Sequence, residues 1–197
     1  MTGTFICNGE ERQVIGTGYH DHQWGTTNFL KDWNHWIWAR QRIGDHTMLV
    51  FDLVTCERLG FKRLPICFVQ DAQGNLVFES TDNVACEVLS SYEENVASGK
   101  TYPKDIDYTF RANGKETVCH LRQKRVLEFG GVKTSPMAMR LLIKAMGINH
   151  SYTRYLGEGE LILSSLPEGD EPSELLRLKS DLIYEFMFPG DSFEGHM

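Results

Sequence analysis

Short segments in which apolar and polar residues alternate recur along most of the chain, and their spacing constrains the fold more than any other feature. Alternation is typical of strands with one buried face, and segments of this length suit antiparallel strands joined by turns. The expected strands are Val14–His22, His35–Arg42, His46–Thr55, Leu64–Gln70, Leu76–Ser80, Asp105–Arg111, Glu116–Phe129, Ser151–Ser164 and Asp181–Phe188. About nine strands without alternating helices predict an all-β, mainly antiparallel barrel or sandwich.

Turn residues and one helical pattern complete the predicted organisation. The sequence Ala-Asn-Gly-Lys at residues 112–115 is the clearest hairpin turn, because Asn-Gly readily adopts the positive φ angles of a tight turn. Residues 134–147 predict one α-helix, with Ser135 as its N-cap and Gly147 as its stop. A short helical turn is also indicated at Ser173–Leu178. We expect a single domain over residues 1–197.

Composition and charge argue against several classes of binding partner. The chain has 197 residues and a formal net charge of −7, which argues against nucleic-acid binding because such binding needs a basic surface. No apolar run suits a membrane span, and no secretory signal is recognisable. The five cysteines are scattered without a Cys-x-x-Cys pair, which is typical of free thiols in a reducing compartment. We therefore expect a cytoplasmic protein.

Aromatic and ionisable residues are concentrated between residues 19 and 38. In a strand, Tyr19 and Asp21 would share one face, and Trp36 and Trp38 would share a face of the next strand. A carboxyl group enclosed by tryptophans inside a barrel tends to keep its proton. Such an acid can protonate an alkene or a leaving hydroxyl, and aromatic faces stabilise the resulting cation. The alternative, which periodicity alone favours, is that Asp21 pairs with Arg40 or caps a turn.

Two further features of the sequence bear on chemistry: a pair of histidines and a second carboxylate. His20 and His22 could ligate one ion from alternate strand positions, but Thr26 stands where a cupin pattern needs a glutamate. We expect no metal. Tyr155 and Glu185 lie in aromatic-rich segments that would add to a barrel wall. Glu185 is a second candidate acid or base, although a solvated strand residue is the simpler interpretation.

Residues 16–25 (Gly-Thr-Gly-Tyr-His-Asp-His-Gln-Trp-Gly), followed by Trp36-Ile-Trp38, resemble a known family signature. It is the Gly-x-Gly-Tyr-x-Asp-His-Asn-Trp-Gly…Trp-x-Trp pattern of the hydroxyneurosporene synthase (carotenoid 1,2-hydratase) family, which is grouped with lipocalin-like proteins. The resemblance implies a lipocalin-like β-barrel of about eight or nine strands, with the helix near residues 134–147 inserted. It also implies an apolar, isoprenoid or polyene-like ligand and a hydration that needs no cofactor or metal.

The resemblance further implies which residues form the site. Asp21 falls on the motif's aspartate, the expected proton donor, and Tyr19 on its tyrosine, so both are predicted to be catalytic. Gln23 stands where the family has asparagine. The residues expected to bind substrate are His22, Trp24, Trp36, Trp38, Tyr155 and Glu185.

The family commonly carries two barrels with the motif near their junction, whereas the motif here begins at residue 16. The chain thus resembles the second barrel alone. Since the absence of a packed partner exposes an apolar face, we predict a homodimer.

Three functions stand foremost on the sequence, and a metal-dependent barrel enzyme comes fourth. The first is an enzyme that hydrates, dehydrates or cyclises a small apolar molecule by acid catalysis inside the barrel. The second is a non-catalytic, lipocalin-like carrier of a small hydrophobic ligand, for which the Asp21 carboxyl would be dispensable. The third is a cyclase or Diels–Alderase-like catalyst that works by shape, through proximity and orientation.

Overall fold

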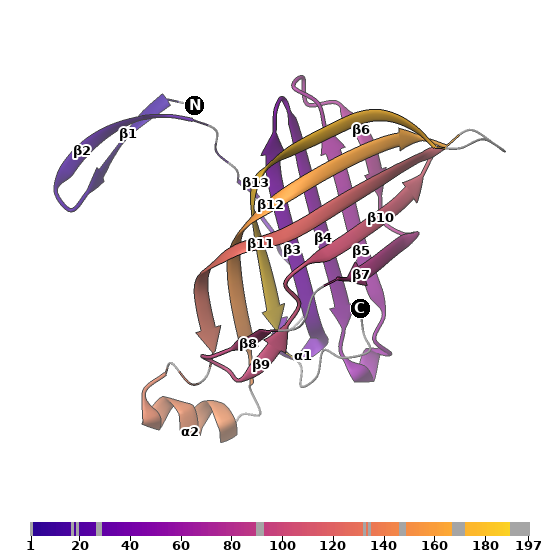
Figure 1. Ribbon diagram of the computed structural model, residues 1–197. Coiled ribbons are helices and arrows are strands. Elements are labelled where there is room, and N and C mark those ends of the chain that lie inside the picture. The colour runs from indigo at the N-terminus through magenta and orange to yellow at the C-terminus, as the bar shows by residue number, and fades with distance from the viewer. Residues whose placement is uncertain are drawn as a thin grey trace.

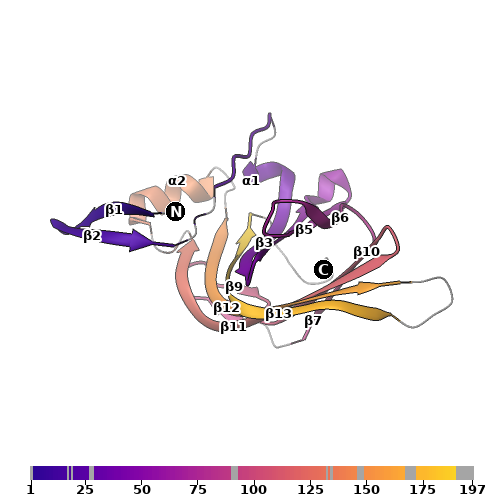
Figure 2. The ribbon, with the colours of Figure 1, turned by 90° about the horizontal axis from the view of Figure 1, so that it is seen from above.

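The computed structural model describes residues 2–16, 18, 20–26, 29–89, 93–131, 133, 135–145, 149–166 and 172–189. Nine strands of this part form one antiparallel sheet in the order β6-β5-β4-β3-β13-β12-β11-β10-β7, and the sheet curls into a barrel (Figures 1 and 2). These strands are β3 (Trp33–Ile43), β4 (His46–Thr55), β5 (Arg63–Gln70), β6 (Leu76–Ser80), β7 (Val84–Val88), β10 (Ile106–Ala112), β11 (Lys115–Gly131), β12 (Ser151–Ser165) and β13 (Ser173–Phe188). The predicted all-β, lipocalin-like barrel is confirmed.

Hairpin chemistry explains how neighbouring strands find their register. Asn113 and Gly114 have φ angles of 52° and 68°, so the predicted turn between β10 and β11 is confirmed. The two ends of the sheet also approach each other. β10 contacts β6, and Lys115 Nζ of β11 donates a hydrogen bond to the backbone oxygen of Val77 of β6 over 2.9 Å. β6 and β7 are joined by only three residues, which brings these edges together.

Smaller elements lie outside the main sheet. They are the hairpin of β1 (Thr2–Cys7) and β2 (Glu10–Ile15), the hairpin of β8 (Glu93–Asn95) and β9 (Lys100–Tyr102), and the helices α1 (Phe29–Asp32), η1 (Glu57–Leu59) and α2 (Met137–Ala145). The β1–β2 hairpin and α2 project away from the barrel (Figure 1). No helix of the described part is long and apolar enough to cross a membrane.

The helix expected within residues 134–147 is confirmed as α2, but two other expectations are wrong. Ser173–Leu178 is the start of β13, because Leu176 and Leu178 pair with Leu163 and Leu161 of β12 and this ladder outweighs the local helical pattern. The strand expected at Val14–His22 ends at Ile15, since the described residues from 20 to 26 have no regular secondary structure.

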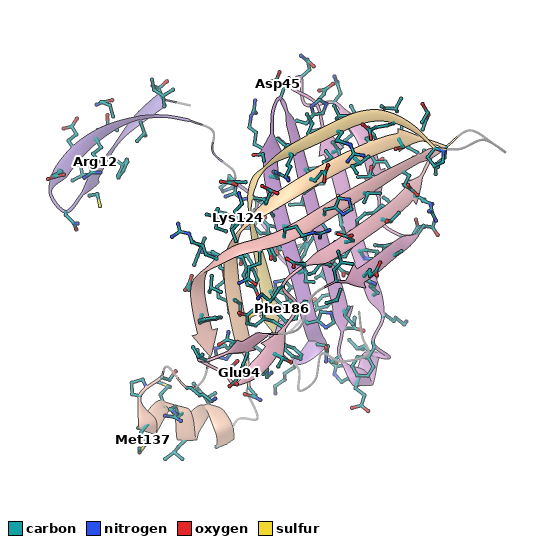
Figure 3. The ribbon with its side chains drawn as sticks, in the orientation of Figure 1. Arg12, Asp45, Glu94, Lys124, Met137 and Phe186 are labelled. Carbon is teal, nitrogen blue, oxygen red and sulfur yellow. The ribbon has the colours of Figure 1, made fainter. Side chains whose placement is uncertain are left out.

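The barrel interior is filled by alternate side chains from every wall. Ile37 and Ala39 of β3 are fully buried there, together with Tyr155 and Tyr184, whose rings stack at 4.5 Å. Phe186 belongs to this interior, whereas Met137 lies outside on α2 with 76% of its surface exposed (Figure 3). Because side chains alternate along a strand, Trp36, Trp38 and Arg40 must project from the outer face of the sheet.

One ionic cluster is enclosed in this interior. Asp52 is fully buried and accepts two hydrogen bonds from Arg63, at 2.8 and 2.6 Å, and one from the hydroxyl of Tyr108 at 2.9 Å. Burial alone would lower the pKa of Arg63, but the hydrogen bonds and charge of Asp52 outweigh it and raise that pKa. Burial also raises the pKa of Tyr108. The negative charge of the Asp52 carboxylate is therefore balanced within the core.

Cys86 lies beside this cluster and makes the stability of the fold sensitive to alkaline pH. Burial, above all, raises the pKa of its thiol from 9.0 to about 11. An unfolded chain releases this proton near pH 9, whereas the folded chain keeps it to a higher pH. The buried thiol therefore stabilises the fold in full below pH 9, and this stabilisation is lost as the pH rises to about 11. We expect the free energy of unfolding to fall by about 2 kcal/mol more in the wild type than in Cys86→Ala between pH 8.5 and 11. Parallel declines of the two proteins in urea titrations would contradict this.

Candidate functional site

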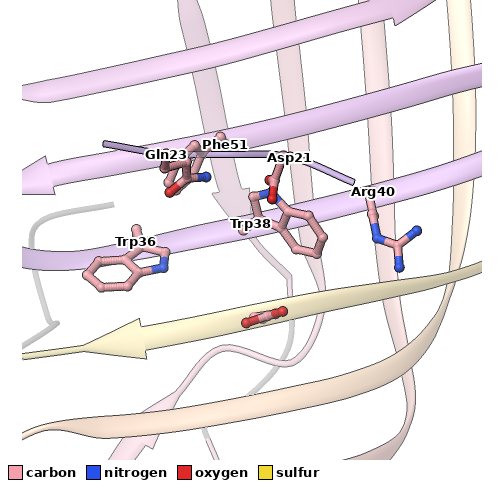
Figure 4. A pocket seen from close by; sticks show the side chains of 7 residues that line it. Asp21, Gln23, Trp36, Trp38, Arg40 and Phe51 are labelled. Carbon is pink, nitrogen blue, oxygen red and sulfur yellow. The ribbon is translucent and has the colours of Figure 1, made fainter. Parts of the chain in front are cut away.

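A cavity of about 340 Å³ lies on the outer face of the sheet, beneath the segment that follows the β1–β2 hairpin. Residues 20–24 cross above β3, and Figure 4 shows Asp21 and Gln23 of this segment over the side chains of β3. Seven residues line the cavity: Asp21, Gln23, Trp36, Trp38, Arg40, Phe51 and Glu185.

Strand register explains why residues far apart in the sequence meet here. Trp38 of β3 is paired with Glu185 of β13 on one side and with Phe51 of β4 on the other. Directly paired residues of neighbouring strands point to the same face. The three strands therefore place a carboxylate, an indole and a phenyl ring in one row, and the period of two adds Trp36 and Arg40.

Two side chains of β12 hold the carboxylate of Glu185. The hydroxyl of Tyr152 donates a hydrogen bond to Glu185 Oε2 over 2.6 Å, and Arg154 Nη2 lies 3.4 Å from Oε1. Burial, followed by the hydrogen bond to Glu185, raises the pKa of Tyr152 above its usual range, so the phenol stays protonated and donates. Arg154 also pairs with Glu128 at 3.5 Å. Glu185 thus has one oxygen fixed by a phenol and its charge opposed by a guanidinium.

Arg40 is oriented by an aromatic ring. Its Cζ lies 5.6 Å from the ring centroid of Trp38, a distance typical of a cation–π contact. The contact presents a guanidinium, two indoles and a phenyl ring to the same cavity as two carboxyl groups. This combination can bind a planar apolar molecule, transfer a proton and stabilise developing charge.

A second cavity, of about 540 Å³, also borders the crossing segment. Asp21, Gln23 and Trp38 line both cavities. The residues that line only the second one are Gly18, His20, Thr47, Leu49, Phe68 and Gln70. The two cavities therefore adjoin at these three residues, and their linings reach from Glu185 of β13 to Phe68 of β5.

The structure brings together four of the site residues predicted from sequence: Asp21, Trp36, Trp38 and Glu185. They do not lie inside the barrel, as we expected, but on its outer face, and Asp21 is exposed. The reason is the alternation in β3, where Ile37 takes the interior position and its neighbours face outward.

Three other residues that the sequence predicts for the site do not line this cavity. His22 is exposed, Trp24 has 86% of its surface exposed, and neither lines either cavity. Tyr155 is fully buried on the opposite face of the sheet, where it packs against Tyr102 and Tyr184. We therefore correct the expectation that these three residues belong to the same site as Asp21. Tyr19 lies outside the described residues.

Phe51 was not predicted from the sequence, and neither Arg40 nor Gln23 was assigned to the site. The short turn between the strands expected at residues 35–42 and 46–55 could have located Phe51, because a tight hairpin sets the register and pairs it with Trp38. In the part of the chain that the structure describes, no three His, Cys, Asp or Glu side chains are grouped as a metal ion would require.

Comparisons with known proteins concern the fold and one short segment. No protein-family model matches the sequence. The quinolone epoxide rearrangement protein penF of Penicillium thymicola is 33% identical over 51 residues, which are 26% of this chain and 14% of that protein. The crystal structure of CghA matches with a TM-score of 0.61 and 14% identity, over 97% of this chain and 51% of CghA.

A second solved structure, kievitone hydratase from Nectria haematococca, matches with a TM-score of 0.52 and 14% identity, over 95% of this chain and 49% of that one. This chain thus spans about half the length of the solved structures it matches. At such identity the likeness establishes the architecture. The chain has the lipocalin-like, antiparallel β-barrel fold that these proteins share.

Proposed function

We propose that this chain is a cofactor-independent enzyme of the hydratase or cyclase type, acting on a small apolar molecule in the outer-face cavity. The observation that carries the proposal is that Asp21 and Glu185 share this cavity with Trp36, Trp38 and Phe51. The printed names of the similar proteins, a hydratase and an epoxide rearrangement protein, support a reaction of this kind.

The proposed reaction begins with proton transfer from the Asp21 carboxyl group to an alkene carbon or to a leaving hydroxyl. The π electrons of the alkene form the new C–H bond, or the C–O bond breaks with release of water, and a carbocation results in either case. The faces of Trp36 and Trp38 stabilise this cation. Water or an internal double bond captures it, and a carboxylate accepts the proton that is released. No electrons are gained or lost, so the step requires no redox partner.

We propose an isoprenoid or polyene-like substrate, as the resemblance in the motif region implies. A carrier needs the same cavity but no proton transfer, and a catalyst that works by shape needs no ionisable group. The acid catalyst therefore differs from the other two in transferring a proton, and the carrier differs from both catalysts in leaving the compound unchanged.

The experiment that tests the proposal incubates the protein in D₂O with terpenoid alcohols and polyenes and examines the products by mass spectrometry. Acid-initiated chemistry on an alkene should place one solvent deuterium on carbon, and dehydration of an alcohol should give an alkene. Cyclised product free of deuterium would favour the shape-based catalyst. Bound but unchanged compound would favour the carrier.

We also propose that the chain forms a homodimer through the outer face beside the cavity. The apolar row of this face continues from Phe51 to Ile66 and from Leu53 to Leu64, and Leu64 and Ile66 are 48% and 36% exposed. Large exposed apolar patches are typical of interfaces. Sedimentation equilibrium should report two copies of the 22.6 kDa chain, and Ile66→Lys should shift the equilibrium toward one copy. A wild-type protein that sediments as a single monomeric species would contradict the proposal.

A further inference from the structure

Helix α2 exposes most of its apolar side chains. Its sequence is Met-Ala-Met-Arg-Leu-Leu-Ile-Lys-Ala at residues 137–145. None of its side chains that the structure describes is buried, and the helix projects away from the barrel (Figure 1). Its large apolar side chains with the greatest exposed fractions are Met137 at 76%, Met139 at 49%, Leu141 at 65% and Leu142 at 54%.

A helix of this kind needs a surface that covers it. Isolated helices shorter than about 12–15 residues are marginally stable in water, and most helices in proteins are stabilised by burial of an apolar side. α2 has nine residues, and its described side chains gain no such burial from the barrel. The apolar residues of α2 therefore favour a bound state in which they leave water.

The residues of α2 are divided between two sides of the helix. Its charged residues are Arg140 and Lys144, and positions four apart lie on the same side of a helix. All other positions hold Met, Leu, Ile or Ala. A helix with basic residues on one side and apolar residues elsewhere is typical of helices that lie in a membrane interface.

The charge of the surrounding sequence is complementary to an anionic surface. Residues 129–157 contain four Lys or Arg residues and no Asp or Glu, although the whole chain has 27 acidic residues. The two cations outside α2, Lys133 and Arg154, lie near glutamates. Arg140 forms no ion pair with the residues that the structure describes. Because every acidic residue lies outside this stretch, an anionic surface attracts α2 and repels the rest of the chain.

The size of α2 favours a lipid surface over a protein partner. Stable protein interfaces bury about 800 Å² on each partner and involve about 20–30 residues of each, whereas α2 offers nine. A bilayer needs no complementary shape and accepts apolar side chains along the whole helix. A helix of this length spans about 13 Å, too little to cross the hydrocarbon layer, so it would lie along the interface.

We propose that α2 docks on the surface of a lipid bilayer that contains anionic lipids. Leu141 and Leu142 enter the interface with the other apolar residues of the helix, and the lipid phosphates balance the charges of Arg140 and Lys144. The inference does not depend on the proposed reaction, because none of the described residues of α2 lines either cavity of the outer face.

Co-sedimentation of the full chain with lipid vesicles tests the inference. Vesicles of phosphatidylcholine with one third phosphatidylglycerol are compared with vesicles of phosphatidylcholine alone. We expect binding to be about tenfold or more tighter on the anionic vesicles, and to weaken as NaCl rises from about 0.05 to about 0.5 M. Amides of residues 137–145 should exchange hydrogen more slowly on the vesicles. Equal binding to both kinds of vesicle, or no binding, would overturn the inference.

Two substitutions with matched controls identify the helix. Leu141→Gln keeps the charge and the helix propensity and should weaken binding to anionic vesicles by about tenfold. Leu175→Gln removes a leucine that is 56% exposed on β13 and should leave binding unchanged. Arg140→Gln should weaken binding by about fivefold. Arg42→Gln, beside Asp45 at the end of the barrel away from α2 (Figure 3), should have no effect. Equal losses in a variant and its control would contradict docking through α2.

A second copy of this chain is the other occupant that these experiments would reveal. If α2 covered another copy, Leu141→Gln would shift the sedimentation equilibrium toward one copy, and the wild type would bind neither kind of vesicle. That result would overturn the inference, as would slower hydrogen exchange on vesicles confined to the barrel strands. Because Leu141 is exposed, its substitution should leave the thermal unfolding temperature unchanged, which separates lost docking from misfolding.

Discussion

Replacing Asp21 by asparagine is expected to lower kcat/KM by about 10²- to 10⁴-fold, on whichever compound the deuterium experiment identifies as a substrate. Asparagine keeps the size of the side chain but has no proton of comparable acidity to donate. Because Asp21 lies in a segment without regular secondary structure, the substitution should leave the barrel intact. The thermal unfolding temperature should therefore stay close to that of the wild type.

A matched pair of variants makes this result specific. Asp45→Asn removes another carboxylate, one whose side chain is 83% exposed in the turn between β3 and β4, and it should leave kcat/KM unchanged. Glu185→Gln removes the second carboxylate of the cavity and should lower kcat without removing the deuterium from residual product, because Asp21 still delivers it. Full activity in Asp21→Asn would exclude Asp21 as the acid and would favour the carrier or the shape-based catalyst.

Replacing Arg63 by methionine is expected to lower the free energy of unfolding by about 3–5 kcal/mol. The substitution leaves the Asp52 carboxylate in the barrel interior, where none of its surface is exposed. One hydrogen bond, from Tyr108 at 2.9 Å, would remain. A buried charge that loses its ionic partner costs far more than a surface charge, since no solvent can replace the partner.

Urea unfolding followed by circular dichroism measures this difference. Arg111→Met is the control, because Arg111 pairs with Glu116 at 2.7 Å but is 64% exposed, and such a pair contributes less than about 1 kcal/mol. Equal effects of the two substitutions would show that the Asp52–Arg63 pair is solvated in solution. Asp52→Asn combined with Arg63→Met should be less destabilising than Arg63→Met alone, since the buried charge is then absent.

The Asp52–Arg63 pair and the outer-face cavity lie on opposite faces of the sheet. Asp52 of β4 faces the interior, and Phe51, its neighbour in sequence, lines the outer cavity. The interior is occupied by side chains from all walls of the barrel, including the stacked pair of Tyr155 and Tyr184. The groups suited to proton transfer and to binding a flat molecule instead meet on the outside. In this chain the barrel is a scaffold, and the candidate site is built on its surface.

Much of this arrangement follows from the sequence alone. Alternating segments and turn residues predict most strands of the barrel, and the Asn113–Gly114 turn predicts one register correctly. The apolar pattern predicts α2 within two or three residues of its ends. The motif and the period of two single out Asp21, Trp36 and Trp38, which do line one cavity with Glu185.

Only the tertiary structure decided which face of each strand is the inside. A period of two states that Trp36 and Trp38 share a face, but not whether that face is enclosed. The choice depends on side chains that pair across great sequence distances, such as Ala39 with Tyr184 and Tyr155 with Val126. Packing of the whole interior is more favourable with Ile37 and Ala39 inside. This preference is the sum of contacts from many strands, so no short stretch of the sequence reveals it. The same cooperative pairing makes residues 173–178 a strand despite their helical pattern, and it leaves Asp21 outside the barrel.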